Sequence, residues 1–488
     1  MLGTLIRKEL TATLLSPKFG ATFAVCTALI LLSVMIGIQE YRAAVRQYDE
    51  AIQLADQNLR TESSWMGLST HAYRKPDPMQ ILITGVNNDV GRTSGINQFE
   101  DVKLTNSVYS EDTIFALFRS VDLAFIVSVV LSLFAILFTY DAVNGEREGG
   151  TLQLTFANPV PRATFILAKL LGSWVSLVIP LLVPLLLGGL LLLLSGIPFS
   201  VDQLQRLALF LVVSLLYFTL FIALGVLIST LMRKSSMSFL VSLSAWVVLV
   251  LIVPRLGVMA AGAARPIPSV AETEAQVDAY AKDRWETQMQ AMEARWQQRQ
   301  EGMRSLSPEA REAYQRDHEH EWTEEDAAGR REVERDIDVF SVRVSEDLRN
   351  RKSSQERLAL SLARFSPASS YQLAAMSVAG TDISLKSRYE DAMRAYRSAF
   401  SAFVDKKQQE TGHQGGFRIT VDSQTGFHFS APREGGTLDV SNVPVFSPPQ
   451  STFGEMAAPV AIDAGLLSIV TLLSYAGAFL AFLRYDIR

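Results

Sequence analysis

A group of charged side chains follows the second long apolar run of the sequence. Glu146, Arg147 and Glu148 stand together there, and the pair Gly149-Gly150 comes directly after them. Carboxylates and a guanidinium this close can form ion pairs with a docking protein, although charges at a membrane boundary can also do no more than solvate a turn. Because two glycines interrupt a helix, the pattern predicts a short helix, a break and a second helix. A docking element and a solvated turn both fit this spacing.

The other reactive side chains suggest neither a catalytic nor a metal centre. No Gly-x-x-x-x-Gly-Lys-Ser/Thr loop occurs, so the chain cannot cradle nucleotide phosphates in the usual way. No Ser–His–Asp or paired-carboxylate set can be assigned. His318 and His320 alternate in an acidic stretch and do not share a helix face, and the single Cys26 excludes an internal disulfide. With a net charge of −5 and no basic stripe, we also expect no nucleic-acid binding.

Six apolar runs are long enough to cross a bilayer, which requires about 20 residues. Hydrophobic residues make up 49% of the 488 residues, and they gather in these runs. The sequence therefore predicts a mainly α membrane protein with six transmembrane helices. The expected spans are Phe19–Ile38, Val121–Tyr140, Thr164–Leu194, Leu207–Met232, Met237–Pro254 and Ala461–Phe482.

Positive charges beside the spans predict the orientation of the chain. Lys and Arg in short loops stay on the cytoplasmic side. The charges that fall on one side are Arg7, Lys8, Lys18, Arg147, Arg162, Lys169, Arg233, Lys234, Arg484 and Arg488. We therefore expect both termini, the loop 141–163 and the tail 483–488 to be cytoplasmic, in a bacterial inner membrane. Two polar segments, 39–117 and 255–459, are then external.

The first 18 residues show the pattern of an interfacial helix. Apolar side chains recur at helical spacing opposite a charged face, and Pro17 ends the pattern. The apolar positions are Leu2, Leu5, Ile6, Leu10 and Leu14. A helix lying in the membrane plane and a polar extension of the first span are the two interpretations.

The second external segment contains two apolar stripes that predict a helical hairpin. The first stripe is Trp285, Met289, Met292, Trp296 and Met303, and the second is Val333, Ile337, Phe340, Val344 and Leu348. We interpret both stripes as the seam between two helices, with breaks at Ser307-Pro308 and Gly329. The alternative for the first stripe is a site for a cofactor or a hydrophobic substrate.

Other external elements have weaker patterns. Tyr41–Leu59 is expected to extend the first helix, and Tyr389–Val404 is expected to form another. Gly415–Val440 contains strand-like runs, and Ile81–Val86 is a further candidate strand. The sequence therefore predicts a large mixed, mostly helical external domain.

Arg119 and Asp122 stand three residues apart where the second span begins, so they share one helix face. Asp463 occupies a similar depth in the sixth span. Intramembrane charges can mark an ion path, but these lie close enough to the interface to reach water. We interpret Arg119 and Asp122 as a structural ion pair at the membrane edge, with an ion path as the alternative.

The loop also resembles that of a known family. The pattern Asp141…Gly145-Glu146-Arg147-Glu148-x-Gly150-Thr151-Leu152, then Asn158-Pro159-Val160-x-Arg162 and Lys169, is similar to the coupling loop of type-two ABC transporter permeases. The branch it resembles contains permeases for multicopper-enzyme maturation and gliding motility. Members of that branch share the amphipathic start, the six spans and an aromatic-Asp-basic tail like Arg484-Tyr485-Asp486-Ile487-Arg488.

This resemblance implies a non-catalytic permease subunit whose loop inserts into a cleft on a separate ATPase, which binds ATP and Mg²⁺. A second permease chain, identical or different, would complete the complex, and a periplasmic partner could contact the external domain. The alternative function is a mechanotransmitting or scaffolding complex that passes no solute. The residues that the resemblance assigns to ATPase coupling are Glu146, Arg147, Glu148, Gly149, Gly150, Thr151 and Leu152.

Overall fold

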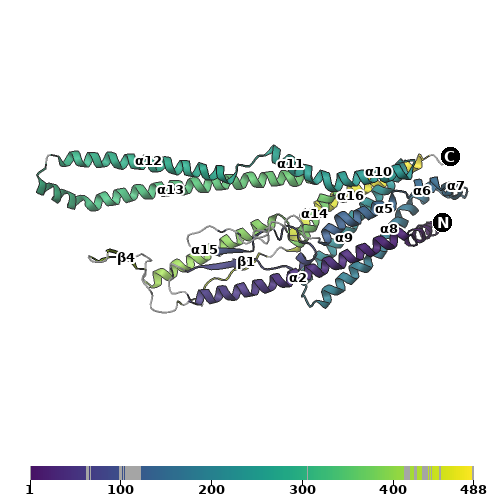
Figure 1. The fold of residues 1–488 in the computed structure, drawn as a ribbon, viewed down its shortest axis with the longest axis horizontal. Helices are drawn as coiled ribbons and strands as arrows, with labels where there is room; N and C mark the ends of the chain where they lie inside the picture. The colour runs from purple at the N-terminus through teal and green to yellow at the C-terminus, as the bar shows by residue number, and fades with distance from the viewer. Residues whose placement is uncertain are drawn as a thin grey trace. The chain divides into compact units, whose positions relative to one another are not determined.

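The computed structural model divides into two compact units, Met1–Ile252 with Ser366–Arg488, and Val253–Phe365. Both consist mainly of helices (Figure 1). The structure describes residues 2–61, 65, 68–88, 90–97, 102, 104, 122–304, 306–411, 418–422, 426–430, 438, 440, 442–449 and 452–485.

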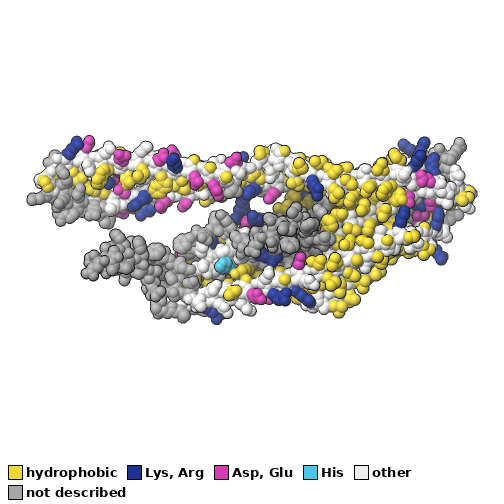
Figure 2. Space-filling model, viewed as in Figure 1, with side chains coloured by type: hydrophobic (Ala, Val, Ile, Leu, Met, Phe, Trp, Pro, Cys, Tyr) yellow, Lys and Arg dark blue, Asp and Glu magenta, His cyan; other side chains and the backbone are white. Residues whose placement is uncertain are grey.

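Among the described residues, six helices are long and apolar enough to cross a membrane, which confirms the predicted number. They are α2 (Pro17–Thr61), α4 to α6 (Leu123–Glu148), α8 (Arg162–Leu194), α9 (Val201–Leu231), α10 to α11 (Ser235–Ala264) and α16 (Phe453–Leu483). The second and fourth have 56% and 50% of their apolar window buried, against 22–28% in the other four. These two spans therefore form the centre of the first unit, and the others present apolar side chains outward (Figure 2).

Two of the spans contain π-helical turns. The second consists of α4 (Leu123–Phe125), η2 (Ile126–Leu131) and α5 (Ser132–Thr139) before it reaches the loop. The fifth consists of α10 (Ser235–Trp246), η3 (Val247–Ile252) and α11 (Val253–Ala264). Such turns are rare and often lie at functional sites.

The N-terminal helix α1 (Leu2–Leu14) is separate from α2, as predicted. It packs along α8, where a side chain at Gly172 would meet Cβ of Glu9 at 2.7 Å. Gly172 therefore permits the close approach of the two helices. The orientation of α1 to the membrane plane stays a prediction.

The helix α14 (Pro367–Ala379) is a buried element that the sequence analysis did not anticipate. Its side chains belong to the same apolar core as those of the spans, and it packs against α9 and α16. Tyr371 is fully buried, stacks on Tyr217 at 4.6 Å and lies 3.0 Å from the Ser214 hydroxyl. Residues 367–379, predicted to be part of the external domain, thus pack among the spans.

In the rest of the first unit, three expected elements are confirmed and one is wrong. The long α2 includes Tyr41–Leu59, α15 (Ser384–Thr411) includes Tyr389–Val404, and β3 (Arg418–Asp422) pairs antiparallel with β4 (Gly426–Ser430). The expected strand at residues 81–86 is wrong: η1 (Pro78–Ile81) is a 3₁₀ turn, while β1 (Thr70–Tyr73) pairs with β2 (Thr93–Ile96). Asp77 caps this turn through the Met79 amide, and Ile81 to Ile83 pack into the core instead of a ladder.

In the second unit, α12 (Val270–Met303) and α13 (Pro308–Ala363) form the predicted hairpin (Figure 1). Gly329 does not break α13; it lies against the Gln288 side chain. The second stripe faces the seam, as predicted. The first is not in the seam: Trp285, Met289, Met292 and Trp296 are 36%, 58%, 37% and 52% exposed, and Met303 alone is buried. Arginines occupy the seam positions of α12 instead.

Candidate functional site

The loop between the second and third spans has the predicted helix, break and helix. They are α6 (Asn144–Glu148) and α7 (Thr151–Phe156). Gly150 joins them with φ of 70°, a left-handed conformation that glycine adopts without steric cost. The sequence alone thus predicts the backbone of this loop.

Four charged side chains fix α6 to its neighbours. Oε1 of Glu146 accepts hydrogen bonds from Lys169 Nζ at 2.6 Å and from Lys8 Nζ at 2.7 Å. Lys169 also contacts Glu9 Oε1 at 2.7 Å, and its side chain is only 5% exposed. A buried cation is tolerated where carboxylates compensate it. These residues, which we call the charge clamp (Lys8, Glu9, Glu146 and Lys169), join α1, α6 and α8.

Glu148 and Asn144 attach the same helix to the start of α10. The Glu148 carboxylate accepts the Ser235 amide at 3.0 Å and the Ser235 hydroxyl at 2.7 Å. A carboxylate at a helix N-terminus also interacts favourably with the helix dipole. Asn144 is fully buried, and its amide oxygen accepts a hydrogen bond from Ser229 at 3.2 Å. The α6 helix is therefore held by α9 and α10 as well.

The second loop helix is anchored by an aromatic cluster at the end of α16. Leu152 is fully buried among Phe156, Phe165 and Phe482, whose rings lie 5.0 to 6.1 Å apart. Arg147 stands over the Tyr485 ring at 5.4 Å. The loop therefore contacts both ends of the chain, and the basic and acidic side chains gather at this end of the first unit (Figure 2). Residues 486–488 of the predicted tail lie outside the described residues.

The seven predicted coupling residues differ in what they contact. Glu146, Arg147, Glu148 and Leu152 are anchors that contact other elements, and of these Glu148 is also exposed. Gly150 is the partly buried link between the two helices. Gly149 and Thr151 are exposed, together with Gln153, Ala157 and Asn158. Leu154, which sequence reasoning did not select, is 70% exposed. Side chains two positions apart on a helix point to nearly opposite sides, so burial of Leu152 could have indicated that Leu154 is exposed.

Sequence reasoning also missed Lys8 and Glu9 as partners of Glu146 and Lys169. Neither has a local signal, because the clamp joins positions 138 and 160 residues apart. The amphipathic pattern of the first helix indicates only which face is polar.

At the predicted membrane-edge pair, Asp122 is a helix cap. Its carboxylate accepts the Phe125 amide at 2.8 Å and the Thr84 amide at 2.9 Å. This geometry supports a structural role for Asp122. Arg119 lies outside the described residues, so the ion pair stays a prediction. Asp463 is fully buried in α16.

A polar cluster lies between β1 and α15, away from the loop. The Arg74 guanidinium donates to the side chain and the backbone of Asn87, each at 2.6 Å. Burial lowers the pKa of Arg74 to about 10, and burial raises the pKa of Tyr389 to about 12. Burial also raises the pKa of Asp77, against its hydrogen bond from the Met79 amide and the nearby Arg206. Arg74 and Tyr389 therefore both stay protonated at neutral pH.

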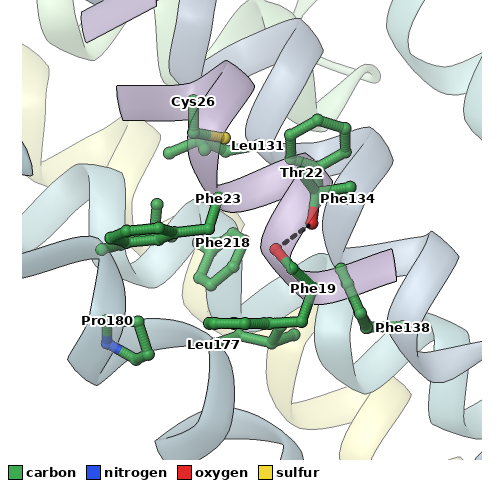
Figure 3. Close-up of a pocket in the computed structure, with 11 residues that line it drawn as sticks. Phe19, Thr22, Phe23, Cys26, Leu131, Phe134, Phe138, Leu177, Pro180 and Phe218 are labelled. Atoms are coloured by element: carbon green, nitrogen blue, oxygen red, sulfur yellow. Dashed lines mark hydrogen bonds between the residues drawn. The ribbon is translucent and has the colours of Figure 1, made fainter. Parts of the chain in front are cut away.

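A small apolar cavity of about 30 Å³ lies among α2, α5, α8 and α9 (Figure 3). Phe19, Phe23, Phe138 and Phe218 line it, and Pro180 of α8 faces it. A cavity of this size could hold a water only if polar groups bonded it, and these side chains offer almost none. In the part of the chain that the structure describes, no group of His, Cys, Asp or Glu side chains could hold a metal ion.

Residues 4–487 match the model of the family described as ABC-2 family transporter protein. A search of curated proteins found no match. The family match includes α1, all six candidate spans, the loop and the hairpin. Since it covers nearly the whole sequence, the chain belongs to the ABC-2 transporter family, a family of multi-pass membrane components of ABC transporters.

Proposed function

We propose that this chain is the permease subunit of an ATP-driven exporter or extractor, coupled through α6 and α7 to a separate ATPase. ATP and Mg²⁺ would be bound by that partner, since this sequence contains no phosphate loop. Two permease chains and two ATPase subunits would form the complex in a bacterial inner membrane. Both termini would be cytoplasmic.

The observation that carries this proposal is the contrast within the loop. Its inner side is fixed to α1, α8, α9, α10 and α16, while Leu154 on its outer side is 70% exposed. A solvated turn would not need anchors on so many elements. A short rigid helix with one exposed apolar side chain can transmit the motion of a partner directly to the spans.

The arrangement of the chain ends supports the proposed orientation. Lys8 of α1 binds Glu146, and Arg162 donates to the Leu483 carbonyl at 2.5 Å. The N-terminal helix, the loop and the end of α16 therefore lie on one side of the first unit. The same side carries the excess of Lys and Arg in short segments, which is typical of the cytoplasmic side.

The decisive experiment is co-purification with the ATPase after substitution of one exposed leucine. Leu154→Ala should weaken ATPase association and lower membrane-stimulated ATP hydrolysis by roughly tenfold, because a central apolar contact is worth about 1–2 kcal/mol. Leu15→Ala is the matched control, since Leu15 is 79% exposed beside α1. Equal retention of the ATPase by both variants would refute docking through α7.

A second function, the transmission of force without solute transport, is favoured by the connection of the hairpin. Only three residues separate α13 from the buried α14, and Ser366 both caps α14 and donates to the Leu249 carbonyl of η3. Movement of α13 would therefore pull on the core of the spans. A two-glycine insertion after Arg364 should abolish force transmission but leave ATP hydrolysis unchanged. Retained activity on the external partner would exclude this function.

A further inference from the structure

The exposed face of α12 carries an apolar stripe that the hairpin itself does not use. We call Trp285, Met289, Met292 and Trp296 the outer stripe; these residues are between 36% and 58% exposed. Two tryptophans and two methionines in one row are unusual on a solvated helix, where such residues more often mark an interface.

The contacts between α12 and α13 form without the outer stripe. Arg284 pairs with Asp336 at 2.5 Å, and Arg299 pairs with Glu325 at 2.6 Å. Arg299 also lies over the Trp322 ring at 4.9 Å. Tyr280 stacks on Phe340 at 4.1 Å. Rotating α12 to bury the stripe against α13 would separate these pairs, so the stripe needs another partner.

The spacing of the stripe points to a helix as that partner. Its members follow one another at intervals of four, three and four residues. These are the intervals of a coiled-coil seam, in which alternate apolar side chains insert between those of a facing helix. The four positions carry no charge that would oppose such packing.

The order of the side chains in the outer stripe indicates which helix packs against it. The stripe reads Trp, Met, Met, Trp in either direction, with symmetric intervals. A twofold contact joins the same patch on both partners, so the patch must complement itself. If two copies of α12 meet, tryptophan faces tryptophan and methionine faces methionine, whether the helices run parallel or antiparallel. We propose that the outer stripe is a homodimer contact between the hairpins of two copies of this chain.

The size of the stripe fits this occupant. At the observed exposures, the four side chains leave roughly 400 Å² per copy to be covered, about half of what one partner gives to a standard stable interface. Such a contact is too small to join free proteins tightly. It suffices where both chains are already held together, because tethering converts it into an intramolecular contact. The inference thus rests on the two-permease assembly proposed above, and it makes the two permeases identical.

The single cysteine of the chain makes a direct test possible. Cys26 is 1% exposed, so a cysteine introduced on α12 would be the accessible thiol. Met292→Cys lies in the stripe, and the exposed Ala294→Cys lies about 200° away around the same helix. Under mild oxidation of membranes containing the complex, Met292→Cys should give a covalent dimer at about tenfold higher yield than Ala294→Cys. The parent chain should give none.

A second set of variants tests the contact itself. Adding Trp285→Glu and Trp296→Glu to the Met292→Cys chain should reduce the cross-linked dimer about tenfold, because charges would be buried in the contact. In an antiparallel contact position 292 faces position 289, so Met289→Cys and Met292→Cys chains are also oxidised as a mixture. Equal yields at positions 292 and 294, or no dimer from either Met292→Cys alone or this mixture, would overturn the inference. So would cross-linking to a protein of different mass. If the ATPase still co-purifies with two permease chains, such a failure concerns the stripe alone; a single permease chain would also refute the proposed assembly.

Discussion

The α6–α7 loop and the α12–α13 hairpin both hold charges inside a contact and leave apolar side chains outside. In the loop, Lys169 is 5% exposed and joins three helices through two carboxylates. In the hairpin, Arg284 and Asp336 are each 29% exposed and join only two helices. The loop is therefore held by contacts with several helices, whereas the hairpin is held by the single contact between α12 and α13. Charges in the two regions should therefore contribute very different amounts to stability.

Removing the central cation of the loop should have the largest effect. Lys169→Met leaves the Glu9 and Glu146 carboxylates partly buried and compensated only by Lys8, at a cost of about 3–5 kcal/mol. Thermal unfolding of the detergent-purified chain measures this loss. Lys8→Met is the control, since the Lys8 side chain is 46% exposed and should cost under about 1 kcal/mol. Similar losses from the two variants would contradict a buried clamp.

The two leucines of α7 should differ almost as sharply. Leu152→Ala removes a fully buried side chain from the aromatic cluster and should cost about 2–4 kcal/mol of unfolding free energy. Leu154→Ala, which deletes the same atoms from an exposed position, should stay within about 0.5 kcal/mol. Chemical denaturation with tryptophan fluorescence would compare them. A destabilised Leu154→Ala chain would show that this side chain packs within the protein instead of docking outside it.

The hairpin seam should tolerate the loss of a charge better than the loop. Arg284→Met removes one partly exposed ion pair, and we expect it to lower the unfolding free energy of the hairpin by about 1 kcal/mol, measured by thermal melting with circular dichroism. The control is Lys282→Met, whose pair with Glu286 is 78% and 62% exposed and should contribute almost nothing. A loss as large as that of Lys169→Met would remove the distinction between the two regions.

Substitution of Asp77, a carboxylate outside both regions, should change stability least. It should raise the stability, whereas the substitutions above lower it. Because burial raises the folded-state pKa of Asp77 above its ordinary 3.8, protonation favours the folded chain. This contribution is complete below pH 3.8 and is lost as pH rises through the folded-state pKa. Asp77→Asn should therefore unfold at a slightly higher temperature than the parent at neutral pH, and the gap should close on acidification. A gap independent of pH would exclude this cause.

The membrane part of the fold follows from the sequence because a span is a local property. Length and apolarity decide it, and the break at Gly149-Gly150 is equally local. The helix α14 was missed for the same reason: its 13 residues are too short and too rich in Ser and Ala for a span, and only its neighbours bury it. The charge clamp joins residues far apart in the chain, which no local pattern reveals.

For α12, the spacing of apolar residues correctly predicted a helix but indicated the wrong face as the one that packs against α13. The seam positions Arg284, Gln288 and Arg295 and the stripe positions Trp285, Met289 and Trp296 have the same intervals, shifted by one residue. One residue turns a helix by about 100°, so both rows fit a hairpin on sequence grounds. The prediction placed the apolar row in the seam because it followed hydrophobicity. In the structure, arginines occupy the seam positions of α12 and pair with carboxylates of α13.

The burial of α14 also constrains how the chain is assembled during synthesis. This helix lies between the hairpin and α15 in the sequence, yet it packs against α16, which is synthesised more than 70 residues later. It can reach its final contacts only after α16 has also left the ribosome. Until then α16 does not cover the apolar side of α14. Chains interrupted before Phe453 would therefore expose this apolar side and become targets for quality-control proteases.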